Sequence, residues 1–132
     1  MTYSETQPLQ EEPFHERLAT ARRKLLMVGW DEADAREALD RVRFTARQWL
    51  LDQHNGDVKA FGPNAESQRA GIEAQIMYEP TIMDAAEILR AATRKRERAE
   101  LDVTILLDRR RADEKQTERM AAVAALAGRE WE

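Results

Sequence analysis

Between Pro80 and Gly128 the chain contains neither glycine nor proline. Apolar residues recur three and four positions apart through this stretch, which is the spacing of one face of an amphipathic helix. The pattern predicts a single helix over about residues 80–126, which would be about 70 Å long at 1.5 Å per residue. A helix of this length needs an apolar partner along one side, because helical propensity alone does not stabilise it sufficiently. We therefore predict an all-α fold.

The apolar stripe of this helix has the heptad-like spacing that is typical of coiled coils. Charged residues make up 35% of the chain and aromatic residues only 6%, so we expect a thin core and a helix that assembles with copies of itself into an oligomer. Arg96 interrupts the stripe, as do Arg110, Asp113 and Thr117, and a break within residues 108–118 that produces a helical hairpin is the alternative. The predicted oligomer interface consists of Ile82, Leu89, Val103, Leu106 and Met120.

The N-terminal region predicts two shorter helices after a tail. Residues 1–12 contain three glutamates and no basic residue, which indicates a disordered acidic tail in front of a single helical domain over residues 13–132. Pro13 suits the first turn of a helix, and Gly29 suits the left-handed cap at the end of that helix. Asp31 would then begin the second helix as its N-cap residue.

A connector separates the second predicted helix from the next one. Gly56 and Gly62 predict a loop over residues 55–63, in which at least one of the two glycines has a positive φ. Asn64 is predicted to cap a third, short helix over about residues 65–77. We interpret three aromatic residues as core anchors, namely Trp30, Trp49 and Phe61.

Part of the chain resembles a known group of proteins. The connector "VKAFGPN", the charged segment "AESQRAGIEAQI" and the helix "AAEILRAATRKRERAELDVTILLDRRR" follow one another in this order. This order is similar to that of small helical proteins of tailed bacteriophages and prophages, over about residues 57–124. Such proteins are often encoded near recombination and single-strand-binding genes, so the resemblance implies a role in DNA metabolism in a bacterial host cell. It implies no catalytic residues.

Basic residues gather along the predicted long helix. Residues 90–119 contain ten lysines and arginines against seven aspartates and glutamates. Arginine suits bidentate phosphate contacts, and neutralised phosphates give affinity for nucleic acid without a base-reading motif. We therefore expect a non-enzymatic accessory protein that binds DNA as an oligomer. The candidate binding residues are Arg94, Lys95, Arg96, Arg98, Arg109, Arg110, Arg111 and Lys115.

Two features of the same helix keep a second interpretation open. Acidic residues interleave with the basic clusters, so a solvated surface with intrahelical ion pairs is the alternative, for example Asp108 with Arg111 or Arg96 with Glu100. No aromatic residue lies near either cluster, which disfavours stacking on single strands. The alternative function is a coiled-coil interaction protein that binds a replication, recombination or host-defence protein.

The second predicted helix carries a ladder of carboxylates, namely Asp31, Asp34, Glu37 and Asp40. All-α nucleotide pyrophosphatases hold Mg²⁺ with helical Glu-x-x-Glu and Glu-x-x-Asp pairs, because hard cations bind several oxygens. Here "EALD" precedes "ERAE", which reverses that family's order. Arg36, Arg41 and Arg43 can also neutralise the ladder. We interpret it as an acidic surface and expect no catalytic residue, metal or cofactor.

Several other classes of protein are disfavoured. The chain has no cysteine and only two histidines, His15 and His54, so neither a disulfide framework nor a thiolate metal site is expected. It contains neither a P-loop nor a glycine-rich dinucleotide motif. No apolar run reaches membrane-spanning length, and the first residues lack the order of a signal peptide. We expect a cytoplasmic protein without a membrane partner.

Overall fold

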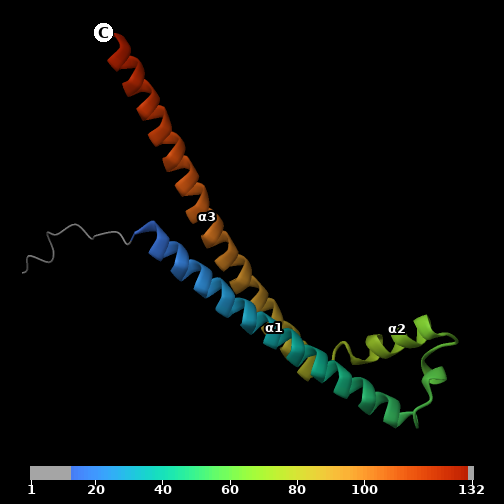
Figure 1. Cartoon of the computed structure of the whole chain (residues 1–132). Helices are drawn as coiled ribbons and strands as arrows, with labels where there is room; N and C mark the ends of the chain where they lie inside the picture. The colour runs from blue at the N-terminus through green and yellow to red at the C-terminus, as the bar shows by residue number, and fades with distance from the viewer. Residues whose placement is uncertain (1–12, 131–132) are drawn as a thin grey trace, which may run out of the picture. The chain divides into compact units, whose positions relative to one another are not determined.

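The computed structural model describes residues 13–130, and the predicted tail over residues 1–12 lies outside this range. Four elements follow one another along the chain (Figure 1): helix α1 (Phe14–Gln53), the 3₁₀ helix η2 (Val58–Phe61), helix α2 (Ala65–Ile76) and helix α3 (Pro80–Glu130). The described residues form no β-strand. The predicted all-α fold is therefore confirmed.

Helix α3 begins at Pro80, as predicted, and continues to Glu130. The Glu79 carboxylate accepts hydrogen bonds from the backbone N–H groups of Thr81 and Ile82, at 3.0 and 3.3 Å, and from the Thr81 hydroxyl. These hydrogen bonds satisfy backbone donors that have no partner within the first turn of a helix. They also lower the pKa of the Glu79 carboxyl, chiefly through the hydrogen bond from the Thr81 side chain.

The alternative hairpin, with a break within residues 108–118, is wrong, because α3 is continuous through this segment. Its polar side chains pair along the helix instead of ending it. Arg110 Nε donates to Glu114 at 3.0 Å, and Arg111 lies 3.9 Å from Asp108. Ion pairs spaced by three or four residues stabilise a helix slightly, and the segment contains no glycine or proline that would oppose them.

The N-terminal half differs from the prediction, because one helix of 40 residues replaces two shorter ones. Gly29 and Asp31 lie inside α1, and neither caps a helix. A glycine within a helix costs only about 1 kcal/mol relative to alanine. Packing close to Gly29 offsets this cost, since Ala35 is buried and Glu32 bonds to Arg96 of α3. Tertiary contacts therefore override the local signal for a break.

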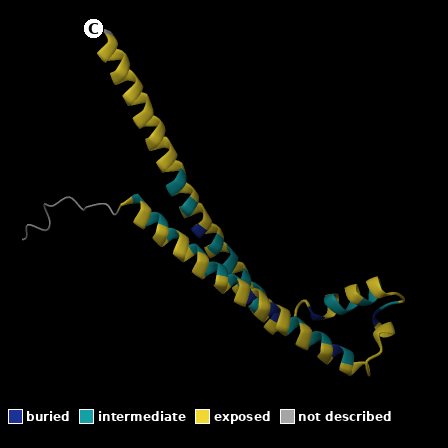
Figure 2. Ribbon diagram, viewed as in Figure 1, coloured by how far each residue is buried: buried dark blue, intermediate teal, exposed yellow. Residues whose placement is uncertain are grey.

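The chain divides into two compact units. The central unit is Leu26–Glu97, and the terminal unit comprises the described residues on either side of it, 13–25 and 98–130. Figure 2 shows how sparse burial is along both helices. The core of the central unit consists of Leu39, Leu50, Phe61, Ile76 and Ile82. Among the described residues of the terminal unit, only Ala99 is buried.

Local hydrogen bonds define both ends of the connector in the central unit. Asn55 has φ 54°, and the Gly56 N–H donates to the Leu51 carbonyl at 2.8 Å, so α1 ends in a left-handed turn. Asn64 Oδ1 accepts from the Ser67 N–H at 2.8 Å, and Ser67 Oγ accepts from the Asn64 N–H at 3.2 Å. This capping box begins α2 and confirms the predicted role of Asn64.

The positive φ that was predicted in the connector is confirmed at both glycines, with 75° at Gly56 and 155° at Gly62. At the end of the connector, η2 lies against α2. A Cβ atom on Gly71 would lie 2.6 Å from the Phe61 carbonyl oxygen, so only glycine allows this close approach. It brings the Phe61 side chain into the core, and the Phe61 ring meets His54 edge-on at 4.8 Å between centroids.

The aromatic residues divide into one core anchor and two exposed side chains. Phe61 is buried, as predicted. The same interpretation is wrong for Trp30 and Trp49, which are 60% and 63% exposed. The inward positions of α1 in the central unit are taken by Ala35, Leu39 and Leu50. The two tryptophans therefore remain as apolar surface without cover among the described residues.

Candidate nucleic-acid interface

Arg96 is engaged in helix packing within the central unit. Its Nε donates to both carboxylate oxygens of Glu32, at 2.9 and 2.8 Å, and both side chains are half-buried. The hydrogen bond from Arg96 lowers the pKa of the Glu32 carboxyl, because it favours the charged form. This ion pair joins α1 to α3. A residue that was predicted to bind phosphate thus serves the fold.

Arg110 has an analogous position in the terminal unit. Its guanidinium lies 5.0 Å from the centre of the Phe14 ring, in the geometry of a cation–π contact. Two of the residues that interrupt the apolar stripe, Arg96 and Arg110, therefore contact α1 of the same chain. The ion pair that was expected between Asp108 and Arg111 is confirmed at 3.9 Å.

The other predicted phosphate ligands of α3 are exposed, namely Arg94, Lys95, Arg98, Arg109 and Lys115. Within residues 13–130, none of these five side chains takes part in an ion pair. Arg98 and Arg109 are eleven residues apart, so they lie on nearly the same face of α3, about 16 Å apart along its axis. Both belong to the terminal unit.

A second source of basic residues, at the start of α1, was not predicted from the sequence. Residues 13–25 contain Arg17, Arg22, Arg23 and Lys24 against the single acidic residue Glu16. In the terminal unit, Arg17 and Lys24 line a shallow groove together with Arg109 of α3. The seven-residue spacing of Arg17 and Lys24, two helical turns, was the signal that could have revealed this pair.

This basic groove, defined by Arg17, Lys24 and Arg109, has a volume of about 450 Å³. Ala21 and Leu106 contribute apolar surface to it, and Asp102 contributes one carboxylate. Three cations from two helices thus surround an open surface that a phosphate chain can approach. Phosphate contacts of this kind position a protein on nucleic acid without reading its sequence.

The residues of the predicted oligomer interface have different environments within the chain. Ile82 belongs to the core of the central unit, and Leu89 packs against that core. Val103 and Leu106 are half-buried in the terminal unit, whereas Met120 is exposed. Helix α1 of the same chain covers much of the stripe from Ile82 to Leu106, because α1 is long enough to serve as a partner helix. Among the described residues, the stripe beyond Arg110 stays open.

The carboxylate ladder is an exposed face of α1, which contains Asp31, Asp34, Glu37 and Asp40. Glu37 pairs with Arg41 at 3.3 Å along the same helix. Within the described residues, no group of three histidine or acidic side chains has the arrangement that holds a metal ion.

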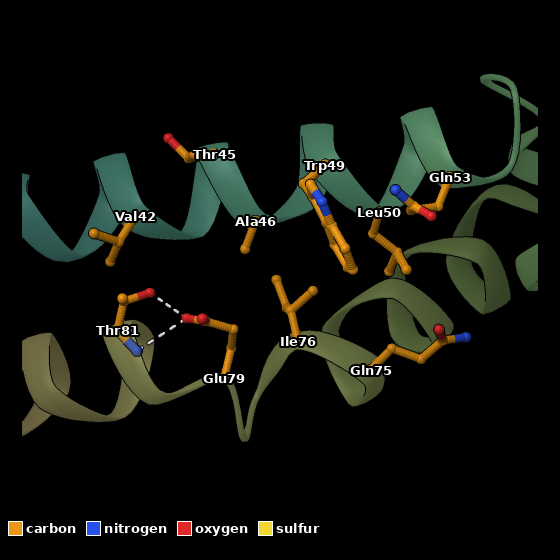
Figure 3. A pocket seen from close by; sticks show the side chains of 10 residues that line it. All are labelled: Val42, Thr45, Ala46, Trp49, Leu50, Gln53, Gln75, Ile76, Glu79 and Thr81. Atoms are coloured by element: carbon orange, nitrogen blue, oxygen red, sulfur yellow. Dashed lines mark hydrogen bonds between the residues drawn. The ribbon is translucent and has the colours of Figure 1, made fainter.

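An apolar groove also opens in the central unit, between α1, the end of α2 and the start of α3. Figure 3 shows Val42, Ala46 and Trp49 of α1 facing Ile76, with the Glu79–Thr81 hydrogen bonds at one end. The groove has a volume of about 830 Å³. It contains no basic side chain, so it does not suit phosphate.

Comparisons of the chain with protein-family models, curated proteins and solved structures gave no match. None of the helices in residues 13–130 has the combination of length and apolar character that is needed to cross a bilayer.

Proposed function

We propose that the protein is a non-enzymatic accessory protein of DNA metabolism, of the type that tailed bacteriophages encode, and that it binds nucleic acid as an assembly of copies. The basic groove of the terminal unit is the proposed contact surface. One observation carries the proposal, namely the separation of charge between the units. The described terminal unit has eleven basic and eight acidic residues, whereas the central unit has ten basic and thirteen acidic residues.

The chemistry of the basic groove suits a phosphate backbone. Arg17, Lys24 and Arg109 provide point charges and guanidinium donors from two helices, and Arg98 extends this basic surface along α3. Repulsion between phosphate and the acidic central unit would orient the nucleic acid towards the terminal unit. Binding would be tolerant of sequence, because these contacts do not involve base edges.

The test is fluorescence anisotropy with a labelled duplex and a labelled single strand, over a series of salt concentrations. The variant Arg17→Ala/Lys24→Ala/Arg109→Ala removes the three cations that define the basic groove. If all three contact phosphates of a duplex, its plot of log affinity against log salt should become flatter by about 2.7, since each contact contributes about 0.9. Affinity should fall for every sequence tested.

A matched variant controls for net charge. Lys59→Ala/Arg69→Ala/Arg90→Ala also removes one lysine and two arginines, but these exposed residues belong to the central unit. We expect its affinity and salt dependence to stay close to those of the wild type. Equal losses in both triple variants would refute the assignment to the terminal unit, and no binding of the wild type at low salt would refute nucleic-acid binding itself.

A second candidate function is a helical interaction protein that binds another protein. It is favoured by the apolar end of α3, where Met120, Val123 and Leu126 are 59–66% exposed. Such a surface is unusual for a segment that functions alone in water. A wild type that binds no nucleic acid but associates through these side chains would favour this candidate.

A further inference from the structure

The basic groove of the terminal unit lies between two helix segments whose relative direction follows from their contacts. The Arg110 guanidinium lies 5.0 Å from the centre of the Phe14 ring, so the first turn of α1 lies against α3 at Arg110. The groove is lined by residues between 17 and 24 of α1 and between 102 and 109 of α3. From the cation–π contact, the residue numbers therefore rise along α1 and fall along α3. The two segments are antiparallel in the terminal unit.

This antiparallel arrangement brings two arginines to the same end of the groove. Along α1, Arg17 lies about 4.5 Å from the cation–π contact and Lys24 about 15 Å from it. Along α3, Arg109 lies about 1.5 Å from the contact and Asp102 about 12 Å from it. Arg17 and Arg109 thus flank the near end of the groove, and we call them the arginine pair. At the far end, Lys24 and Asp102 have opposite charges.

Neither member of the arginine pair has an ion-pair partner among the described residues. On α3, Asp108 and Glu114 pair with the two arginines that follow Arg109, at 3.9 and 3.0 Å. Asp113, one turn beyond Arg109, lies outside ion-pair distance of it. On α1, Arg17 has no acidic residue three or four positions away. Within residues 13–130, two like charges therefore share one end of the groove without a neutralising carboxylate.

The chemistry of the arginine pair suits one phosphate group. Two guanidinium groups at one end of a groove repel each other and attract an anion. A phosphate group has two or more free oxygens, so it can accept hydrogen bonds from both guanidinium groups at once. Arginine suits this role better than lysine, because its planar donors match the geometry of phosphate and stay charged. The far end of the groove has no second guanidinium.

We propose that Arg17 and Arg109 together bind a single phosphate group of the nucleic acid, which thereby links α1 to α3 in the terminal unit. This inference rests on the proposed function and assigns the two arginines to one shared phosphate. Lys24 lies about 10 Å from Arg17 along α1, so it contacts a different phosphate. The link joins two segments that have only Ala99 buried among their described residues.

The first test is the salt dependence of duplex affinity. Arg17→Ala/Arg109→Ala should flatten the plot of log affinity against log salt by about 0.9, since one phosphate contact is lost. Two separate contacts would give about 1.8. The triple variant that also lacks Lys24 should accordingly show about 1.8 instead of about 2.7. A flattening close to 1.8 in the double variant would refute the shared phosphate and leave nucleic-acid binding intact.

The matched control is Arg22→Ala/Arg23→Ala. It also removes two arginines from the terminal unit, but both are exposed residues of α1 that do not line the basic groove. We expect its duplex affinity and salt dependence to stay close to those of the wild type. If the control loses as much affinity as Arg17→Ala/Arg109→Ala, general attraction by the terminal unit explains the binding, and the assignment to the arginine pair is wrong.

The second test uses inorganic phosphate without nucleic acid. Phosphate bound between the two arginines should slow amide hydrogen exchange at the start of α1, over residues 14–25, relative to chloride at the same pH and ionic strength. Phosphate also stabilises folded proteins by general exclusion from their surface, so the two double variants are compared. Arg22→Ala/Arg23→Ala should keep the protection, and Arg17→Ala/Arg109→Ala should lose it. Equal protection in both variants would refute the shared phosphate.

The two tests distinguish failure of this inference from failure of the proposed function. A wild type that binds neither duplex nor single strand at low salt refutes the proposed function. If such a protein still shows protection by inorganic phosphate that depends on Arg17 and Arg109, the arginine pair is a site for phosphate groups from another source. Loss of both signals refutes the site itself.

Discussion

The central and terminal units use the same two long helices in opposite ways. In the central unit, α1 and α3 enclose a core together with η2 and α2, and that core includes Leu39, Ile76 and Ile82. In the terminal unit the helices have a single buried residue, Ala99, among those described. The difference lies in the intervening elements, because η2 and α2 supply Phe61 and Ile76 only to the central unit.

The charges follow the same division. The central unit combines a core with an excess of acidic residues, whereas the terminal unit combines exposed helices with an excess of basic residues. The proposed binding surface therefore lies outside the part of the chain that holds the core. Substitutions on a surface with few buried contacts cost little folding free energy. Such a surface can therefore carry exposed cations and apolar side chains.

The largest expected effect is a loss of stability from a cavity in the core. Ile76→Ala should lower the free energy of unfolding by about 2–5 kcal/mol, because a buried isoleucine leaves a void that the surroundings fill only partly. Leu106→Ala in the terminal unit should cost only about 1 kcal/mol, since Leu106 is half-buried. Urea denaturation followed by circular dichroism measures both, and equal losses would contradict the contrast between the units.

The second effect concerns the capping box of α2 in the central unit. Asn64→Ala removes the acceptor for the Ser67 N–H and should cost about 1 kcal/mol of stability. Asn64→Asp retains an acceptor and should cost much less. Nucleic-acid affinity should be the same in both variants. A normal melting temperature together with lost binding would instead assign the connector to the functional surface.

The third effect is a gain of stability at the glycine that was expected to end a helix. Gly29→Ala should stabilise the protein by about 0.5–1 kcal/mol, because α1 is continuous there and alanine is the better helix former. A Cβ atom at Gly29 would meet nothing within 4 Å. Gly128→Ala, near the end of α3, should have less effect. Destabilisation by Gly29→Ala would indicate a helix break at this position.

The smallest expected effect is on the pH dependence of the central unit. Glu32 and Glu79 have pKa values below the ordinary 4.5, chiefly because of hydrogen bonds from Arg96 and Thr81 respectively. Such carboxylates stabilise the folded state above pH 4.5, and this contribution is lost as the pH falls from there through the lowered values. The melting temperature, measured between pH 7 and pH 3, should therefore fall more steeply with decreasing pH below about pH 4.5.

Glu79→Gln provides the check on this pH dependence. It should flatten the acid side of the profile, because glutamine does not titrate. An acid side that stays as steep in Glu79→Gln as in the wild type would exclude Glu79 as a contributor.

Local signals were sufficient to predict much of the fold. Pro80 and the glycine-free stretch after it identified the start and continuity of α3, and Asn64 identified the start of α2. Each of these features is determined by residues within about one helical turn, so the local sequence is sufficient to predict it. The same holds for the positive φ at Gly56.

Features that depend on distant residues were not predictable in this way. Gly29 is a valid local stop signal, but α1 continues through it, and nearby Arg96 of α3 donates to Glu32. The apolar stripe of α3 indicated a partner helix, but its spacing cannot distinguish α1 from another copy. The basic groove was also missed, because Arg17 and Arg109 are far apart in the sequence and meet only in the folded terminal unit.

The terminal unit is formed by two separate segments of the chain, and this determines the order in which the two units can fold during synthesis. The central unit is one contiguous stretch and can form as soon as it has been synthesised, whereas residues 13–25 must wait for residues beyond 98. At about 5–20 residues per second this delay is roughly 4–15 s. During that time the basic start of α1 is a nascent segment without its partner helix, and it is open to any anionic polymer nearby.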